Sequence, residues 1–248
     1  MKVEVHFTPA NLDEMYLKDK TVVVIDVLRA STTICTALQN GAKEIIPVNN
    51  IDSAVKISGS LYGDVTLRAG ERNARRIEGF NLGNSPAEYT GEIVKGKSII
   101  FLTTNGSVAV VKGRHAGKLI VAGFVNISAV ANFLAQEAGD VTIVCAGKEN
   151  KFALEDAACA GKLINKLSGE AAQEVSVDDA GSAAVVLDRT LGKSVLKLVK
   201  SSEHGRYLSE IGFSQDLKIA AHIDSINILP MLTGNVIRAH KEANKQVA

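Results

Sequence analysis

The chain has 248 residues, 46% of them hydrophobic and 22% charged, with a formal net charge of +1 at pH 7. That length can bury the core of one large α/β domain, while the near-neutral charge and an aromatic content of 4% disfavour nucleic-acid binding. No apolar run approaches a membrane span, and the N-terminus lacks the apolar stretch of a signal peptide. We therefore predict a cytoplasmic protein that binds neither nucleic acid nor membrane; a homo-oligomer is compatible with this sequence.

Strands and helices are predicted to alternate through the first 146 residues. Apolar, β-branched runs predict strands at Val22–Val27, Glu44–Val48, Val65–Ala69, Ser98–Thr103, Lys118–Ala122 and Val141–Ala146. Apolar residues at three- and four-residue spacing predict helices at Ser31–Gln39, Asp52–Ser60, Ser107–His115 and Ser128–Glu137. This alternation indicates an α/β fold with a mainly parallel sheet flanked by helices.

The pattern changes near Glu149, after which helical spacing dominates. The predicted helices there are Phe152–Leu167, Ala180–Asp188, Lys193–Lys200 and Glu203–Ile211. No low-complexity linker separates the two parts, so we predict a single α/β domain over residues 1–248. Residues 150–248 form its helix-rich C-terminal part or a subdomain.

The first strand-to-helix junction has the composition of an anion site. Asp26 ends an apolar strand, where its carboxylate is well placed to bind Mg²⁺. Arg29 can contact a phosphate with two N–H groups. We expect Ser31 to cap the following helix, and Ser31, Thr32 and Thr33 to present hydroxyls and free amides to a phosphate. The structural alternative is a capped helix in which Asp26 pairs with Arg29.

Two well-known phosphatase mechanisms do not fit the sequence. The aspartyl-phosphate hydrolases need a second Asp two residues after the Asp nucleophile at the end of a strand. Leu28 stands at that position after Asp26, so this mechanism is not supported. Cysteine phosphatases need an Arg six residues after the catalytic Cys. None of the three cysteines has one, because the residues at that spacing are Lys151, Asn165 and Gly41. We interpret the cysteines as small buried apolar residues.

Polar residues also follow the later strands, where ligands bind in parallel sheets. Thr104, Asn105 and Gly106 follow the strand Ser98–Thr103 and are candidates for contact with an acid or phosphate oxygen. Asn84 and Ser85 lie in a shaped loop near four arginines, Arg68, Arg72, Arg75 and Arg76. We predict that Arg72, Asn84 and Ser85 bind substrate; ordinary turns and a solvated charge cluster are the alternatives.

An acidic pair, Glu155 and Asp156, begins the helix after the last predicted strand. One of the two is expected to point inward, and an inward carboxylate needs a metal or a basic partner. We choose Asp156 as a second carboxylate near Asp26.

The ordered set of motifs resembles the 2-phosphosulfolactate phosphatases. The resemblance rests on residues 26–33, Gly70-Glu71-Arg72, Gly83-Asn84-Ser85-Pro86, Thr103-Thr104-Asn105-Gly106, Cys145-Ala146-Gly147 and Glu155-Asp156, and runs from about Val22 to Pro230. It implies a Mg²⁺-dependent hydrolase that converts 2-phospho-3-sulfolactate to 3-sulfolactate and phosphate, a step of coenzyme M synthesis in methanogens. It also implies an α/β topology that need not be the standard Rossmann one.

The residues and the resemblance together give a hypothetical mechanism for a small anionic phosphorylated substrate. Water attacks phosphorus with Mg²⁺ held by Asp26 and by Asp156 or Glu71, while Arg29 and the amides of residues 31–33 stabilise the developing charge. His204 and His222 are candidates for the general acid. The alternatives are a Mg²⁺-dependent lyase or transferase acting on a small phosphorylated acid, and a non-catalytic anion-binding domain.

Overall fold

A computed structural model describes residues 1–60, 66–170 and 174–240 of the chain. Its strands form one sheet in the order β5-β4-β6-β3-β11-β10-β7-β2-β8-β1-β9. In chain order they are β1 (Lys2–His6), β2 (Thr21–Ile25), β3 (Glu44–Val48), β4 (Thr66–Arg72), β5 (Arg75–Arg76), β6 (Ser98–Leu102), β7 (Lys118–Ala122), β8 (Val141–Cys145), β9 (Ser176–Val177), β10 (Pro230–Thr233) and β11 (Val236–Ala239).

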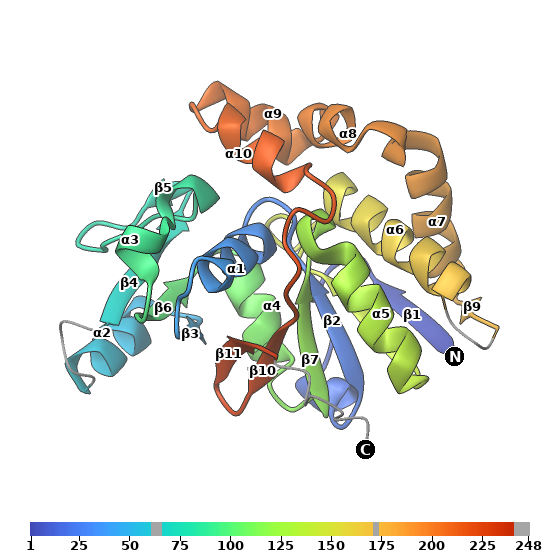
Figure 1. The fold of residues 1–248 in the computed structure, drawn as a ribbon, viewed down its shortest axis with the longest axis horizontal. Helices are drawn as coiled ribbons and strands as arrows, with labels where there is room; N and C mark the ends of the chain where they lie inside the picture. Colours follow the sequence, from blue (N-terminus) through green and yellow to red (C-terminus); the bar gives the residue numbers. More distant parts are fainter. Residues whose placement is uncertain (61–65, 171–173, 241–248) are drawn as a thin grey trace, which may run out of the picture.

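The helices flank this sheet (Figure 1). They are α1 (Ala30–Gln39), α2 (Ile51–Ser60), α3 (Gly91–Val94), α4 (Gly106–Lys112), α5 (Ile127–Glu137), α6 (Leu154–Glu170), α7 (Asp179–Leu191), α8 (Val195–Ser201), α9 (Glu203–Glu210) and α10 (Ser214–Ala220). Short 3₁₀ turns are η1 (Glu14–Leu17), η3 (Pro86–Glu88), η4 (Phe124–Asn126) and η5 (Gly192–Ser194). No helix in the described ranges is long and apolar enough to cross a membrane.

The predicted α/β class, with a mainly parallel sheet and a helix-rich C-terminal part, is confirmed. The six predicted strands correspond to β2, β3, β4, β6, β7 and β8, with ends that differ by at most a few residues. Val65, the first residue of one predicted strand, lies outside the described residues.

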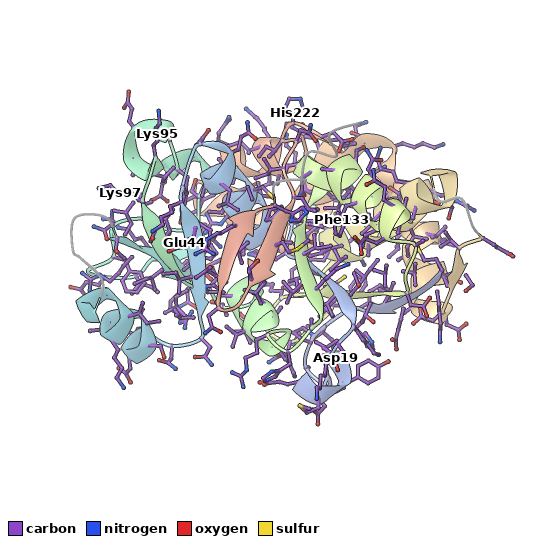
Figure 2. The ribbon with its side chains drawn as sticks, turned by 60° about the horizontal axis from the view of Figure 1, so that its bottom comes forward. Asp19, Glu44, Lys95, Lys97, Phe133 and His222 are labelled. Carbon is purple, nitrogen blue, oxygen red and sulfur yellow. The ribbon has the colours of Figure 1, made fainter. Side chains whose placement is uncertain are left out.

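A hairpin from the far end of the chain joins two groups of parallel strands. One group is β4-β6-β3 and the other is β7-β2-β8-β1-β9. Strands β10 and β11 lie between them and pair antiparallel with β7 and β3, respectively. Figure 2 shows the hairpin beside Glu44 of β3, whose carboxylate accepts a hydrogen bond from Arg238 Nε at 3.0 Å. This arrangement departs from a standard Rossmann sheet, which the resemblance had left open.

Each face of β2, an interior strand of the sheet, packs against a different helical layer. Val23 and Ile25 belong to the core that includes α5, α6 and the later helices. Val22 and Val24 belong to the core formed with α1 and α4. Because successive side chains of a strand point to opposite faces, a strand covered on both sides is apolar throughout. The continuous apolar run that predicted β2 therefore reflects burial on both faces.

Candidate active site

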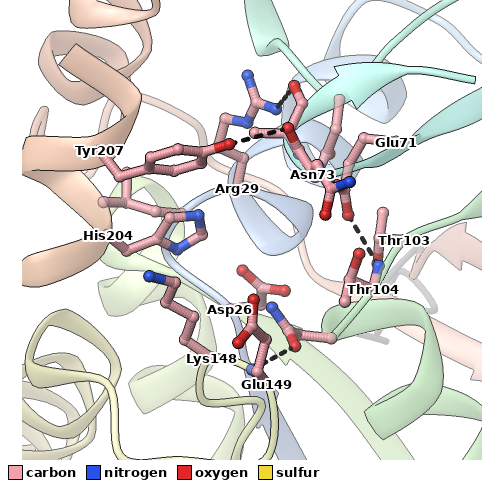
Figure 3. A pocket seen from close by; sticks show the side chains of 14 residues that line it. Asp26, Arg29, Glu71, Asn73, Thr103, Thr104, Lys148, Glu149, His204 and Tyr207 are labelled. Carbon is pink, nitrogen blue, oxygen red and sulfur yellow. Dashed lines mark hydrogen bonds between the residues drawn. The ribbon is translucent and has the colours of Figure 1, made fainter. Parts of the chain in front are cut away.

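The residues that follow β2, β4, β6 and β8 meet at one cavity of about 260 Å³. Helix α9 lines it from the other side. Figure 3 shows His204, Tyr207 and Lys148 on one wall, and Glu71, Thr103 and Thr104 on the opposite wall. The lining residues are Asp26, Leu28, Arg29, Glu71, Asn73, Ala74, Asn84, Thr103, Thr104, Asn105, Lys148, Glu149, His204 and Tyr207.

Asp26 is the buried carboxylate of this cavity that has the fewest protein partners. Its Oδ1 accepts one long hydrogen bond, from the amide of Ala30 at 3.3 Å. Burial raises the pKa of the Asp26 carboxyl to about 6, although His204 and the Ala30 amide act in the opposite direction. A Cβ at Gly106 would collide with Asp26 Oδ2. The glycine therefore makes room for the carboxylate, a packing role that its predicted substrate contact did not include.

Asp156 lies behind the cavity and does not line it. Its two carboxylate oxygens accept hydrogen bonds from the amides of Val27 at 2.8 Å and Gly147 at 3.0 Å. Burial and the neighbouring Asp26 raise the pKa of Asp156 well above its usual range. Asp156 thus ties the ends of β2 and β8 together beneath Asp26. Glu155 is also buried, so both acids point inward where one was expected.

Glu71 lines the cavity opposite His204 and holds two loops in place. Its Oε2 accepts from the amide of Ala74, and its Oε1 accepts from the amide of Thr104, both at 2.8 Å. Asn73 and Ala74 connect β4 to β5 with φ angles of 52° and 60°. Since a left-handed conformation is unfavourable for alanine, the Glu71 hydrogen bond helps to keep this turn in shape.

Arg29 pairs with Asp216, not with Asp26 as the structural alternative proposed. Its Nη1 donates to Asp216 Oδ2 at 2.8 Å, and its Nη2 donates to the carbonyl of Ala74 at 2.7 Å. The guanidinium carbon lies 4.3 Å from the centre of the Phe213 ring. These contacts use two of the five N–H groups of the side chain.

The expectation that Ser31 caps helix α1 is wrong, and so is the expectation of free amides at Ser31 and Thr33. The helix begins at Ala30, with Arg29 at the N-cap. The amides of Ser31 and Thr33 donate to the carbonyls of Asp26 and Arg29, respectively. These amides are bonded rather than free because the loop after Asp26 folds back against the first turn of α1, where its own carbonyls accept from them.

The hydroxyls of this segment are also bonded to the protein. Ser31 Oγ accepts from the amide of Asp26, while Thr32 Oγ1 donates to the carbonyl of Val27 and Thr33 Oγ1 to that of Asn84. All three residues are buried outside the cavity lining. They shape the junction on which Asp26 and Arg29 sit.

Among the other predicted binding residues, Asn84, Thr104 and Asn105 line the cavity. Asn84 is buried, and its Oδ1 has no hydrogen-bond partner within the described protein. Asn105 Oδ1 accepts from the amide of Glu149 at 2.9 Å. Ser85 lies just behind the wall, where its hydroxyl donates to Asp216 Oδ1 at 2.7 Å. Asn84 thus has the unused polar atom that a bound ligand would satisfy.

The arginine cluster does not reach the cavity. Arg72 is exposed, and its Nη1 donates to the carbonyl of Glu71 at 3.1 Å. Arg68, Arg75 and Arg76 are also absent from the lining. Their strands β4 and β5 direct these side chains toward solvent or, for Arg68, toward the Phe80 ring.

Helix α9 and the loop after β8 supply residues that sequence reasoning did not assign to the site. Lys148 Nζ pairs with Glu203 Oε1 at 2.7 Å, and Tyr207 donates its hydroxyl hydrogen to the carbonyl of Asn73 at 3.2 Å. The place of Lys148 in the loop that follows β8 was a usable signal, whereas Tyr207 had none. The three cysteines are buried, and burial raises the pKa of the Cys145 thiol well above its usual range.

His204 is the general-acid candidate that lies at the cavity. Its Nδ1 is 3.7 Å from Oε1 of the buried Glu155, which leaves Nε2 available to a ligand. His222 does not line the cavity and lies at the periphery of the molecule (Figure 2).

The chain is similar to a described family over most of its length. The family model of 2-phosphosulpholactate phosphatase matches residues 6–235. A probable 2-phosphosulfolactate phosphatase of Caldanaerobacter subterraneus is 40% identical over 98% of this chain and 100% of the relative. Relatives with the same description from Symbiobacterium thermophilum and Clostridium acetobutylicum are 39% and 34% identical, covering 89% and 96% of this chain and 95% and 100% of the relatives.

Proposed function

We propose that this chain, which belongs to the 2-phosphosulpholactate phosphatase family, hydrolyses the phosphate ester of 2-phospho-3-sulfolactate with the help of Mg²⁺. The observation that carries the proposal is the convergence of oxygen ligands and cationic groups on one small cavity. Its volume of about 260 Å³ suits a three-carbon acid rather than a large ligand. The products are 3-sulfolactate and inorganic phosphate.

The charge balance of the cavity supports the need for a metal ion. Three carboxylates line it, those of Asp26, Glu71 and Glu149, against the cations Arg29 and Lys148. Both cations already pair with acids, Asp216 and Glu203, respectively. A substrate with a phosphate, a sulfonate and a carboxylate would meet net negative charge there, so an additional cation favours its binding.

The donor atoms fit Mg²⁺ better than a metal that needs a complete protein cage. The described residues contain no group of three or more His, Cys, Asp or Glu side chains suited to a metal. Mg²⁺ commonly uses one or two carboxylates together with water and substrate phosphate. Asp26 and Glu71 line the cavity and are our choice as ligands; Asp156, bonded to two amides, supports Asp26 from behind.

Arg29, Asn84 and Lys148 would orient the substrate. The unused N–H groups of Arg29 would donate to the phosphoryl oxygens, and Asn84 would bond a polar group at the cavity wall. Lys148 lies at the rim, where it can exchange the exposed Glu203 for a second anionic group of the substrate. Bound Mg²⁺ would neutralise phosphoryl charge and favour the attack of water on phosphorus.

His204 would complete the hydrolysis as the proton donor. The attacking water forms a new P–O bond while the bond between phosphorus and the C2 oxygen breaks. Nε2 of protonated His204 gives its proton to that oxygen, so that the alcohol leaves neutral. The proton lost by the attacking water passes to solvent or back to His204, and Glu155 would hold the ring through Nδ1.

The test is phosphate release from a panel of small phosphorylated acids. The purified chain would be incubated with 2-phospho-3-sulfolactate, 2-phospholactate, 3-phosphoglycerate and phosphoenolpyruvate, with Mg²⁺ or with EDTA. We expect the fastest release from 2-phospho-3-sulfolactate and its loss in EDTA. Asp26→Asn should be inactive, while the remote Asp224→Asn should behave as the wild type.

The panel also separates this function from its rivals. Turnover of a panel member without phosphate release would favour a lyase or transferase. Binding without any turnover, undiminished in Asp26→Asn, would favour an anion-binding domain. Activity that persists after complete metal removal would contradict the Mg²⁺ requirement alone.

A further inference from the structure

Asp216 connects helix α10 to the catalytic cavity without lining it. It lies on α10, and its side chain is only 2% exposed. One carboxylate oxygen accepts from Arg29 Nη1 at 2.8 Å, and the other accepts from the hydroxyl of Ser85 at 2.7 Å. Each oxygen of Asp216 therefore has a defined partner, and the carboxylate plane is held in one orientation.

The guanidinium of Arg29 is fixed on two further sides. Its Nη2 donates to the carbonyl of Ala74 at 2.7 Å, within the turn that Glu71 also bonds. The ring of Phe213, the residue before α10, lies 4.3 Å from the guanidinium carbon. Two in-plane hydrogen bonds and one contact with a ring face leave a planar group little freedom to rotate.

The fixed orientation of the Arg29 guanidinium matters for phosphoryl transfer. Arg29 lines the cavity together with Asp26, and three of its five N–H groups are not used by Asp216 and Ala74. A donor that is already oriented stabilises transition-state charge without the reorganisation that a mobile side chain or water requires. A buried pair is by itself weak evidence for stabilisation of the fold, so a positioning role explains its presence better.

We propose that Asp216 is a positioning residue that orients Arg29 toward the transferred phosphoryl group, with Ser85 orienting Asp216 in turn. The inference rests on the proposed phosphatase function. It assigns to the C-terminal helix α10 a part in catalysis that it performs through Arg29.

The first experiment measures kcat and KM for the full chain with Mg²⁺ and 2-phospho-3-sulfolactate. Asp216→Asn keeps the size of the side chain but removes its charge, and we expect kcat to fall about 10²-fold with KM changed less than about threefold. Ser85→Ala keeps the ion pair and should lower kcat about fivefold.

Asp188→Asn is the matched structural control. Asp188 is buried between α6 and α7, where it pairs with Lys162 at 2.9 Å and accepts from Asn165, away from the cavity. We expect this variant to lower the melting temperature as a lost buried ion pair does, with kcat unchanged.

The second experiment uses guanidinium ion as a replacement for the Arg29 side chain. Arg29→Ala should lose about 10³-fold in kcat, and millimolar guanidinium should restore part of it by binding between Asp216, Ala74 and Phe213. The double variant Arg29→Ala/Asp216→Asn should show no rescue, because the oriented carboxylate is gone.

The outcomes distinguish the inference from the function on which it rests. No phosphate release by the wild type from any panel member would overturn the phosphatase function. An active wild type with unchanged kcat in Asp216→Asn, or equal rescue of the single and double variants, would overturn the role of Asp216. If Asp216→Asn does not fold, an unchanged kcat in Ser85→Ala overturns the role and a selective fall in kcat supports it.

Discussion

Two cations that line the cavity each pair with an acid that does not line it. We call the buried pair Arg29–Asp216 the floor pair and the more exposed pair Lys148–Glu203 the rim pair. At the floor, Arg29 and Asp216 are each 2% exposed, and their geometry is fixed by Ser85 and Ala74. At the rim, Lys148 is 23% exposed and its partner Glu203 is 78% exposed. The floor pair is costly to disturb because neither charge can return to water. The rim pair exchanges readily with solvent or with another anion. The same chemistry thus gives a fixed donor in one place and an exchangeable one in the other.

Breaking the floor pair should have the largest effect on stability. Arg29→Met leaves Asp216 buried without its cation, and we expect a loss of about 3–5 kcal/mol in the free energy of unfolding. The double variant Arg29→Met/Asp216→Leu removes both charges and should recover much of that loss. Urea unfolding at pH 7 measures both. A single variant as stable as the wild type would show that the floor pair is not effectively buried.

Asp26 contrasts with Asp216, because it is a buried carboxylate without a paired cation. Its pKa is raised from 3.8 to about 6, so its contribution to stability is present below pH 4 and is lost as the pH rises through 6. In EDTA at pH 7, Asp26→Asn should therefore be more stable than the wild type by roughly 3 kcal/mol.

The pH dependence of the free energy of unfolding tests the predicted stabilisation by Asp26→Asn. Unfolding measured in EDTA at several pH values should show the advantage of Asp26→Asn shrinking between pH 6 and pH 4. A constant difference across this range would contradict the raised pKa. With Mg²⁺ present the wild type should regain stability, since a ligand that binds the folded state stabilises it.

Removing the cation of the rim should affect substrate binding more than folding. Lys148→Met loses a charge-assisted hydrogen bond, and we expect KM for the proposed substrate to rise about tenfold with the melting temperature almost unchanged. Lys151→Met, a change of the same kind outside the cavity lining, is the control. Equal KM values for the two variants would remove Lys148 from substrate binding.

The smallest effect is expected from the partner of that lysine. Glu203→Gln should leave the melting temperature unchanged, because the carboxylate is highly exposed. It should lower KM about twofold, since Lys148 then has no competing carboxylate. A KM that rises instead would mean that Glu203 holds Lys148 in its productive position.

The sequence predicted the parts of the site that depend on local patterns. Asp26, Thr104 and Asn105 follow apolar strands, so the strand ends that indicated them also placed them at the cavity. The helix cap at Ser31 failed because the loop after Asp26 uses its own amides. The positions of β2, β3, β4, β6, β7 and β8 and the helical C-terminal part followed from periodicity, whereas β1, β5, β9, β10 and β11 were not predicted.

What the sequence could not indicate depends on contacts between distant segments. The partner of Arg29 comes from α10, and Tyr207 reaches Asn73 from α9. Arg72 was favoured by its charged neighbourhood, yet the strand directs it to solvent. Such pairings are set by how the C-terminal helices pack over the sheet, for which periodicity within one segment carries no information.

The hairpin formed by β10 and β11 also affects how the chain is made. Its strands separate β3 from β7, so the sheet is not continuous until residues near the C-terminus have been synthesised. While the ribosome is still adding them, β3 and β7 each have an open edge able to pair with other chains. A nascent chain that stalls before Pro230 therefore exposes the unpaired edges of β3 and β7. Its protection from aggregation depends on the synthesis of β10 and β11.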